Sequence, residues 1–171
     1  MGMIQKNSKW EHKTSVKKGN IGERIVREYL EAKGLVCYQP ITERAHAFDM
    51  LAILDKKQIV IAEVKSKALM NKWRATGFPQ KNYEEYKYIQ EKYGIPVFIF
   101  FVDEHMKKIY GNTLSILDKE IVREGARFPM LIQNGATRIF HFDSMKLVHD
   151  LTDAECEELK QYTRRSYNYA S

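Results

Sequence analysis

Residues 59–65 read Ile-Val-Ile-Ala-Glu-Val-Lys, and this stretch decides how the chain folds. It is apolar enough to form a buried β-strand, yet an acidic and a basic side chain stand near its end. Side chains two residues apart in a strand share one face, so Glu63 and Lys65 project together, while residues 60, 62 and 64 form an apolar opposite face. A carboxylate in such a strand is costly unless a partner compensates it. The strand therefore predicts a polar site on one side of a sheet.

A second apolar run, residues 47–54, carries Asp49 in the same way and is joined to the first by a polar turn. A tight turn between the two strands would point Asp49 away from Glu63. A three-residue loop that pairs Leu54 with Gln58, or a bulge near Asp49, would bring Asp49 opposite Glu63. We expect one of these two irregularities, because only then do both acids reach the same face.

The size and charge of the chain limit its class. Its 171 residues, 44% of them hydrophobic, can bury one core and are too few for two comfortable domains. A net charge of +6 and a pI near 9.2 favour a polyanionic partner in a general way, although many proteins are mildly basic.

Targeting and redox signals are sparse. Cys37 and Cys156 show no metal-binding spacing and no secretory leader precedes them, so we expect two reduced thiols in a cytoplasmic protein. The longest apolar stretch, residues 95–102, is interrupted by Pro96 and is far shorter than the ~20 residues of a membrane-spanning helix. No membrane partner is expected.

Apolar periodicity and turn signals predict one mixed α/β sheet flanked by helices. Helices are expected over residues 20–33, 80–93 and from 152 onward, where Thr152 and Glu155 form a capping box. Strands are expected over residues 35–39, 47–54, 59–65, 96–102, 108–117 and 137–142. Residues 66–79 are predicted to form a mobile basic loop, and residues 118–136 to be irregular.

Two carboxylates beside a lysine are suited to phosphodiester hydrolysis. The reaction needs a nucleophilic water, a cation that neutralises charge on the phosphate, and groups that hold both. Magnesium prefers hard oxygen ligands and takes one or two carboxylates from a protein, which Asp49 and Glu63 would supply. Lys65 would orient the attacking water or offset charge on the transition state.

This pattern resembles the PD-(D/E)XK nuclease superfamily, whose signature is an Asp on one strand and Glu-x-Lys on the next. The resemblance covers about residues 17–110, with Phe48 in place of the proline of the name. Residues 18–24, Lys-Gly-Asn-Ile-Gly-Glu-Arg, are most similar to the archaeal Holliday-junction resolvases. The resemblance implies an additional acidic site residue, Glu23, for which simple helix stabilisation is an equally good interpretation. Gln80 matches a glutamine of some branches imperfectly, since Glu84 occupies the position where they carry tyrosine.

The resemblance implies a restriction-endonuclease-like αβββαβ core over residues 19–117, preceded by a basic arm, residues 1–18, and followed by a C-terminal β/α extension, residues 118–171. The implied activity is a Mg²⁺-dependent DNA endonuclease, with Mn²⁺ able to substitute, acting on branched DNA in repair or recombination. A homodimer would suit the two coordinated cuts of junction resolution. Two alternatives stay open: a phage-type or restriction-type nuclease that reads sequence through the extension, and a non-catalytic DNA-binding module.

Basic residues near the first helix and after Lys65 are candidates for phosphate contacts. They are Lys17, Lys18, Arg24, Lys67, Lys72, Arg74 and Lys81. Trp73 and Tyr83 could stack on an unpaired base, although each is more often a packing residue. His46, three residues before Asp49, could contact a phosphate, and a plain loop residue is the simpler interpretation.

Overall fold

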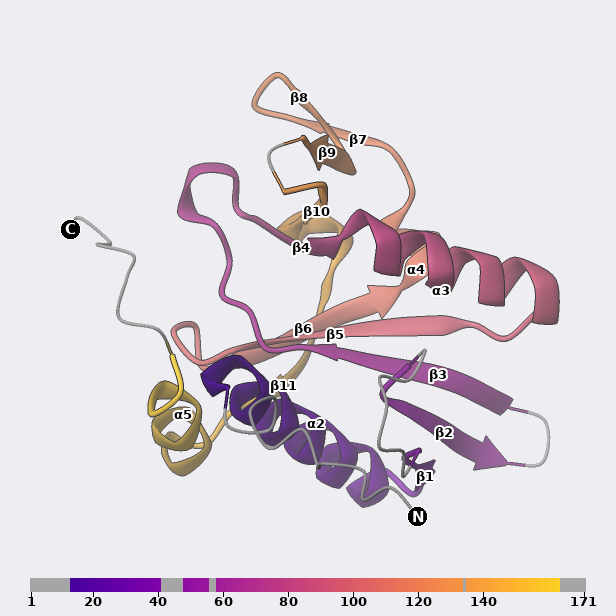
Figure 1. The fold of residues 1–171 in the computed structure, drawn as a ribbon, viewed down its shortest axis with the longest axis vertical. Coiled ribbons are helices and arrows are strands. Elements are labelled where there is room, and N and C mark those ends of the chain that lie inside the picture. The colour runs from indigo at the N-terminus through magenta and orange to yellow at the C-terminus, as the bar shows by residue number, and fades with distance from the viewer. Residues whose placement is uncertain (1–12, 41–47, 56–57, 134, 164–171) are drawn as a thin grey trace, which may run out of the picture.

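A six-stranded mixed sheet in the order β1-β2-β3-β5-β6-β11 forms the centre of the molecule (Figure 1). The computed structural model describes residues 13–40, 48–55, 58–133 and 135–163. Only β3 and β5 pair in parallel, and the other neighbours are antiparallel. The strands are β1 (Val36–Tyr38), β2 (Met50–Asp55), β3 (Gln58–Lys65), β5 (Val97–Asp103), β6 (Lys108–Thr113) and β11 (Lys146–Asp150).

Helices cover both faces of this sheet. In Figure 1, α2 (Thr14–Ala32) and α5 (Asp153–Lys160) lie below it, and α3 (Gln80–Tyr93) lies above it with the short α4 (Leu114–Leu117). The alternation of β3 produces the two layers, because Ala62 and Val64 pack with α2 and α5 while Ile61 packs with α3. Glu63 and Lys65 therefore share the α3 side, as the sequence predicted.

The register between β2 and β3 brings the two acids together. Met50 pairs with Ala62, so the next residue, Asp49, falls opposite Glu63. The register shifts by one residue at Leu54, between the pairs at Ile53 and Asp55. The predicted irregularity is present. It lies at the turn end of the hairpin and is not a bulge near Asp49. The body of the hairpin keeps the register that places both carboxylates on one face.

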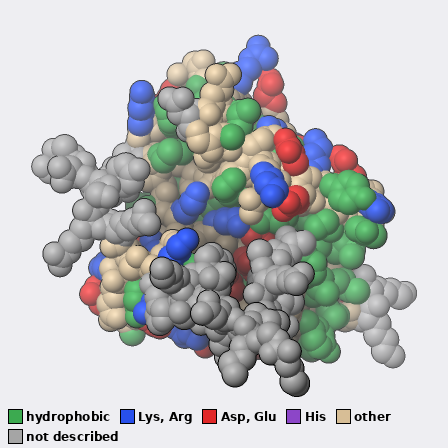
Figure 2. Space-filling model, in the orientation of Figure 1, with side chains coloured by type: hydrophobic (Ala, Val, Ile, Leu, Met, Phe, Trp, Pro, Cys, Tyr) green, Lys and Arg blue, Asp and Glu red, His purple; other side chains and the backbone are tan. Residues whose placement is uncertain are grey.

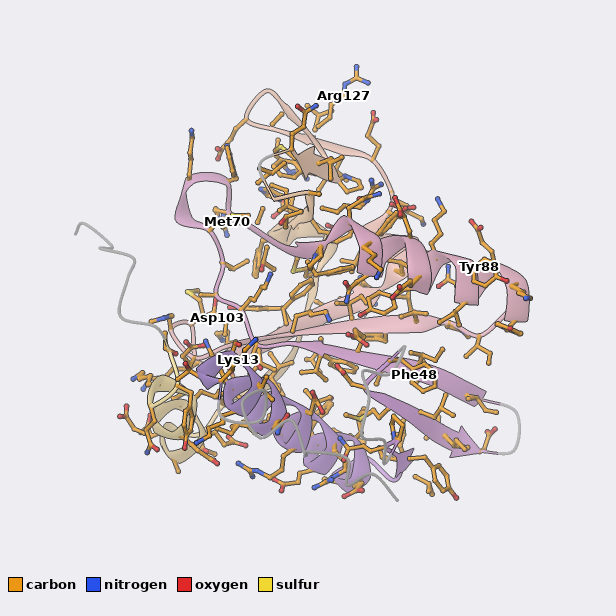
Figure 3. The ribbon with its side chains drawn as sticks, in the orientation of Figure 1. Lys13, Phe48, Met70, Tyr88, Asp103 and Arg127 are labelled. Atoms are coloured by element: carbon orange, nitrogen blue, oxygen red, sulfur yellow. The ribbon has the colours of Figure 1, made fainter. Side chains whose placement is uncertain are left out.

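The prediction of an unstructured loop over residues 66–79 is wrong in its second half. A 3-10 turn at Asn71–Trp73 leads into β4 (Ala75–Pro79), which pairs with β10 (Thr137–His141) in a separate three-stranded sheet with β9 (Met130–Ile132). β4 does not alternate in polarity, because the residues before Pro79 are buried on both sides. Met70, labelled in Figure 3, lies on the segment that rises from the central sheet to this second sheet.

Other elements also differ from the sequence prediction. The first helix begins at Thr14, within the predicted arm, because its first turns carry polar side chains that solvent accepts. The strand predicted over residues 108–117 ends at Thr113, where α4 begins. The region predicted as irregular contains the hairpin of β7 (Ile121–Arg123) and β8 (Ala126–Phe128), with Arg127 at its outer end (Figure 3). The edge strand β11 was missed altogether.

The predicted start of α5 and the predicted end of α3 are confirmed. The capping box of Thr152 and Glu155 opens α5, and Gly94 ends α3 in a left-handed conformation. Cys37 and Cys156 are free thiols. Within the described ranges, no helix is long and apolar enough to cross a membrane.

Gly77 is expected to be essential for joining β4 to β10. A Cβ at this position would lie 1.9 Å from the backbone oxygen of Arg138, and a backbone atom cannot move aside without loosening the pairing. We expect Gly77→Ala to lower the free energy of unfolding by about 2–4 kcal/mol in urea denaturation. Gly19→Ala is the control, since a Cβ there meets only Glu23 Oε1 at 4.0 Å. It should stabilise α2 by about 0.5–1 kcal/mol, and a similar loss in both variants would contradict the explanation.

Candidate active site

Asp49 and Glu63 are locked to each other's strand by two hydrogen bonds. The backbone N–H of Asp49 donates to Glu63 Oε2 at 3.2 Å. The backbone N–H of Val64 donates to Asp49 Oδ2 at 2.7 Å. Each carboxylate thus keeps one oxygen on a backbone amide and has further lone pairs for a ligand. The structure brings together the two acids that the sequence singled out as a metal-binding pair.

Glu63 is buried, with an exposed fraction of 2%, and is held by a compact polar network. Its Oε1 accepts hydrogen bonds from the hydroxyl of Tyr86, at 2.5 Å, and from the ammonium group of Lys65. Lys65 Nζ also lies 3.2 Å from the Tyr86 hydroxyl, and Asn82 Nδ2 donates to that hydroxyl at 3.2 Å. The carboxylate therefore has the partners that a buried charge requires.

Tyr86 donates to Glu63 as a neutral phenol. Burial, followed by the charge of Glu63 and the hydrogen bond to it, raises the pKa of Tyr86 above its ordinary value. Its ring and that of Phe78 also flank the ammonium group of Lys65, whose Nζ lies 5.6 Å and 5.8 Å from the two centroids. The helix α3 thus fixes Glu63 and Lys65 from above, through one side chain that touches both.

Asp49 is destabilised as an anion. Burial contributes most, and the charges of Glu63 and Glu23 add to it, so that its pKa is raised to about 8. The hydrogen bond from Val64 and the charge of Lys65 act in the opposite direction and are outweighed. Two close carboxylates with too little positive charge around them are the donor set that fits a hard divalent cation.

Glu23 faces this site from α2, since its charge acts on Asp49. It does not complete a three-acid cluster: within the ranges that the structure describes, no three His, Cys, Asp or Glu side chains are grouped closely enough to hold a metal ion. The donor set for a cation is therefore the pair of Asp49 and Glu63, with water for the remaining positions.

Gln80 occupies the first position of α3, and its hydrogen bonds go to residues outside the polar network of Glu63. Its side-chain amide donates to Glu84 at 3.1 Å, and its backbone N–H donates to Ala136 at 2.7 Å. The amide that reaches the site belongs to Asn82 instead, and Tyr86 follows it four residues later. Sequence reasoning missed both residues. The signal was the amide and tyrosine at helical spacing, which the search for a glutamine at residue 80 overlooked.

The predicted DNA-contacting residues divide into three groups. Lys18 and Arg24 are engaged in ion pairs, with Glu104 at 2.6 Å and with Glu28 and Glu158 respectively. Lys67 lies beside the site and donates to the backbone oxygen of Gly77 at 3.2 Å. The others are exposed, as Lys67 is: Lys17, Lys72, Arg74 and Lys81. Figure 2 shows Lys and Arg side chains gathered in the middle of this face, between β4 and α2.

The sequence also offered three other candidates for base stacking or phosphate contact. Tyr83 is buried, and its hydroxyl is bound to both carboxylate oxygens of Asp118, at 2.8 and 2.9 Å, so its prediction as a stacking platform is wrong. Trp73 is partly exposed, with Lys72 Nζ 5.0 Å from its ring centroid. His46 lies outside the described residues.

Comparison with known proteins identifies the architecture. No protein-family model matches the sequence, and no curated protein matches it. Among solved structures, the Holliday junction resolvase Hjc of Archaeoglobus fulgidus, an archaeal hyperthermophile, is similar with a TM-score of 0.52. The match covers 74% of this chain and 90% of the resolvase at 12% sequence identity. The two chains share a fold. The predicted mixed α/β sheet with flanking helices is thereby confirmed, and the similarity to a resolvase holds at the level of the fold.

Proposed function

We propose that this protein is a metal-dependent DNA endonuclease. The observation that supports this best is the pairing of Asp49 with Glu63 across β2 and β3, with Lys65 on the same face. The fold shared with a Holliday junction resolvase makes nucleic acid the natural substrate, and the net charge of +6 suits a polyanion. The function rests on the geometry of named groups, because a fold alone hosts many activities.

Asp49 and Glu63 would hold Mg²⁺, for which Mn²⁺ is expected to substitute. A bound divalent cation would supply charge neutralisation at the phosphate and an activated water. Burial and the repulsion between the carboxylates both raise the pKa of Asp49. A bound cation would stabilise the Asp49 anion against both effects, which fits this assignment. Glu23 would tune the charge of the site from α2 rather than complete the ligand pair.

Lys65 would place its ammonium group at the phosphate or at the attacking water. Its Nζ is anchored by Glu63 and by the Tyr86 hydroxyl, so the charge is fixed in position before substrate arrives. Preorganised charge of this kind costs little reorganisation during the reaction. Tyr86 and Asn82 act as positioning residues, because they hold Glu63 and Lys65 in place.

We infer that branched DNA is the preferred substrate and that the protein acts as a homodimer, by analogy with the resolvase of the same fold. A sequence-reading nuclease built on this core, and a DNA-binding module without activity, make different experimental predictions. Purified protein should be incubated with a four-way junction, a flap and a plain duplex, each with Mg²⁺, with Mn²⁺ or with EDTA. The Glu63→Gln variant, purified in parallel, controls for contaminating nucleases.

Cleavage of the junction in preference to the duplex, only with Mg²⁺ or Mn²⁺, would support the proposal. Cleavage at one duplex sequence irrespective of branching would favour a restriction-type enzyme. Tight binding of all three DNAs without any cleavage would leave the binding module as the better description. Equal cleavage by the native chain and by Glu63→Gln would refute the assigned site.

The Tyr86→Phe substitution is expected to reduce the cleavage rate about tenfold, in the range typical of groups that orient metal ligands. The phenyl ring keeps the packing against Phe78, whose centroid lies 5.6 Å from that of Tyr86, so the variant should fold, with a free energy of unfolding lowered by about 1–3 kcal/mol for the lost hydrogen bond to Glu63. Single-turnover rates with saturating protein separate the rate from DNA affinity, which should be unchanged. A lowered affinity with an unchanged rate would contradict the positioning role.

A further inference from the structure

A cavity of about 320 Å³ adjoins the site on the side of Lys65. Its walls come from three parts of the chain that are distant in sequence: the first turns of α2, the residues just beyond β3, and Tyr162 and Thr163 after α5. Lys65 lies in the wall, so the cavity opens directly beside the group that we assign to the reacting phosphate. No residue of the metal-binding pair lines it.

Three lysines line this cavity, and their partners differ. Lys18 is paired with Glu104 at 2.6 Å, and Lys65 is paired with Glu63. Glu104 also accepts a hydrogen bond from Thr163 at 2.7 Å, which closes the far wall. Lys67 donates to the uncharged backbone oxygen of Gly77, and no carboxylate within the described ranges forms an ion pair with it. The excess positive charge of the cavity therefore resides on Lys67.

Ser66, a neutral hydrogen-bond donor, also lines the cavity. The hydroxyl oxygen of Ser66 is buried and has no hydrogen-bond partner within the described part of the chain. Gly22 leaves the room that it occupies, because a Cβ at residue 22 would lie only 2.1 Å from Ser66 Oγ. A buried hydroxyl without a partner costs free energy, and a ligand that accepts a hydrogen bond would recover it.

From these groups we infer that the cavity binds a phosphate group of the nucleic acid other than the one being cleaved. Lys67 supplies the charge and Ser66 a hydrogen bond, while Lys65 separates this phosphate from the scissile one. The inference rests on the proposed function for the identity of the ligand. The phosphate is either an internal phosphodiester next to the cleavage site or a terminal 5′-phosphate, and both have the anionic oxygens that a lysine and a hydroxyl recognise.

The environment of Lys67 agrees with this assignment. Burial and the nearby charge of Lys65 lower the pKa of Lys67 below its ordinary value. An anion seated between the two ammonium groups would offset their repulsion. Loss of Lys67 should therefore affect anion binding more than loss of a lysine that lies outside the cavity.

The test compares Lys67→Gln with Lys72→Gln, an equal change of charge at a nearby residue that does not line the cavity. Binding of fluorescent duplexes with 5′-phosphate or 5′-hydroxyl ends is measured by anisotropy in EDTA, so that the result does not depend on cleavage. Lys67→Gln should weaken binding about tenfold and lower the salt slope by about one, and Lys72→Gln should do clearly less. An effect confined to 5′-phosphorylated ends assigns a terminal phosphate, and an equal effect on both ends assigns an internal one.

Equal losses in the two variants would overturn the inference. A second measurement tests the inference even if Lys67→Gln does not fold. Inorganic phosphate alone should raise the melting temperature of the native chain. Ser66→Ala removes the unpartnered hydroxyl, so it should not lower the melting temperature in phosphate-free buffer, and it should shrink the shift that phosphate produces. A native chain whose melting temperature does not respond to phosphate, or responds as Ser66→Ala does, would also refute the cavity. Because no step requires catalysis, these outcomes are independent of whether the chain cuts DNA.

Discussion

Glu63→Gln is expected to lower Mg²⁺-dependent DNA cleavage on the order of 10³-fold or more. Glutamine keeps the shape of the side chain, and its single amide oxygen can still accept a hydrogen bond from Tyr86, whereas the ion pair with Lys65 is lost. What disappears is the negative charge that, with Asp49, would hold the metal. The effect should therefore fall on catalysis and on metal affinity, with DNA binding in EDTA retained.

The matched control is Glu85→Gln, at an exposed position of α3 one residue before Tyr86. It removes one negative charge at the surface and should leave cleavage within about twofold of the native rate, since exposed groups away from the site contribute little. Thermal unfolding should show that Glu63→Gln is folded, because the substitution removes the repulsion with Asp49 as well as the ion pair with Lys65. An unstable Glu63→Gln variant would indicate that the buried charge is structural.

Asp49→Asn is expected to change the pH dependence of stability. Asp49 has a pKa of about 8 in the folded protein, and an unfolded aspartate titrates near ~3.9. Between these values the folded state binds more protons than the unfolded state, so the free energy of unfolding falls as pH rises. The slope contributed by Asp49 is up to about 1.4 kcal/mol per pH unit. The stabilisation is fully present below about pH 4 and is lost as the pH rises through about 8.

Asparagine does not titrate, so in EDTA the variant should lose this slope and be more stable than the native chain at pH 8. Urea denaturation at pH 5, 6.5 and 8 measures the difference, and Glu85→Gln again serves as the control with the native slope. Added Mg²⁺ should raise the stability of the native chain at pH 8 and affect the variant much less, because ligand binding to the folded state stabilises it. Parallel pH curves for native chain and Asp49→Asn would show that Asp49 carries no such strain.

The local pattern of the chain was sufficient to predict the central strand β3 and the helix α3. The period of two in residues 59–65 placed Glu63 and Lys65 on one face, and the helical period followed by Gly94 placed α3 correctly. These features are readable because each depends on neighbours in sequence. The second sheet was not readable. The residues of β4 before Pro79 are all buried, so its sequence shows no alternation to recognise, and its partner β10 lies far away in the sequence.

The candidate site shows the same division. The residue types at Asp49, Glu63 and Lys65, and the side of the strand that each occupies, follow from the sequence alone because side-chain alternation is a local property of the backbone. Their meeting depended on the register at Leu54, which the turn and the packing of both faces select together. Three features exist only in the folded chain. They are the hydrogen bond from the Tyr86 hydroxyl to Glu63, the cavity beside Lys65, and the position of Lys67 without an ion-pair partner among the described residues. They join segments whose separation in sequence carries no signal, so only tertiary packing decided them.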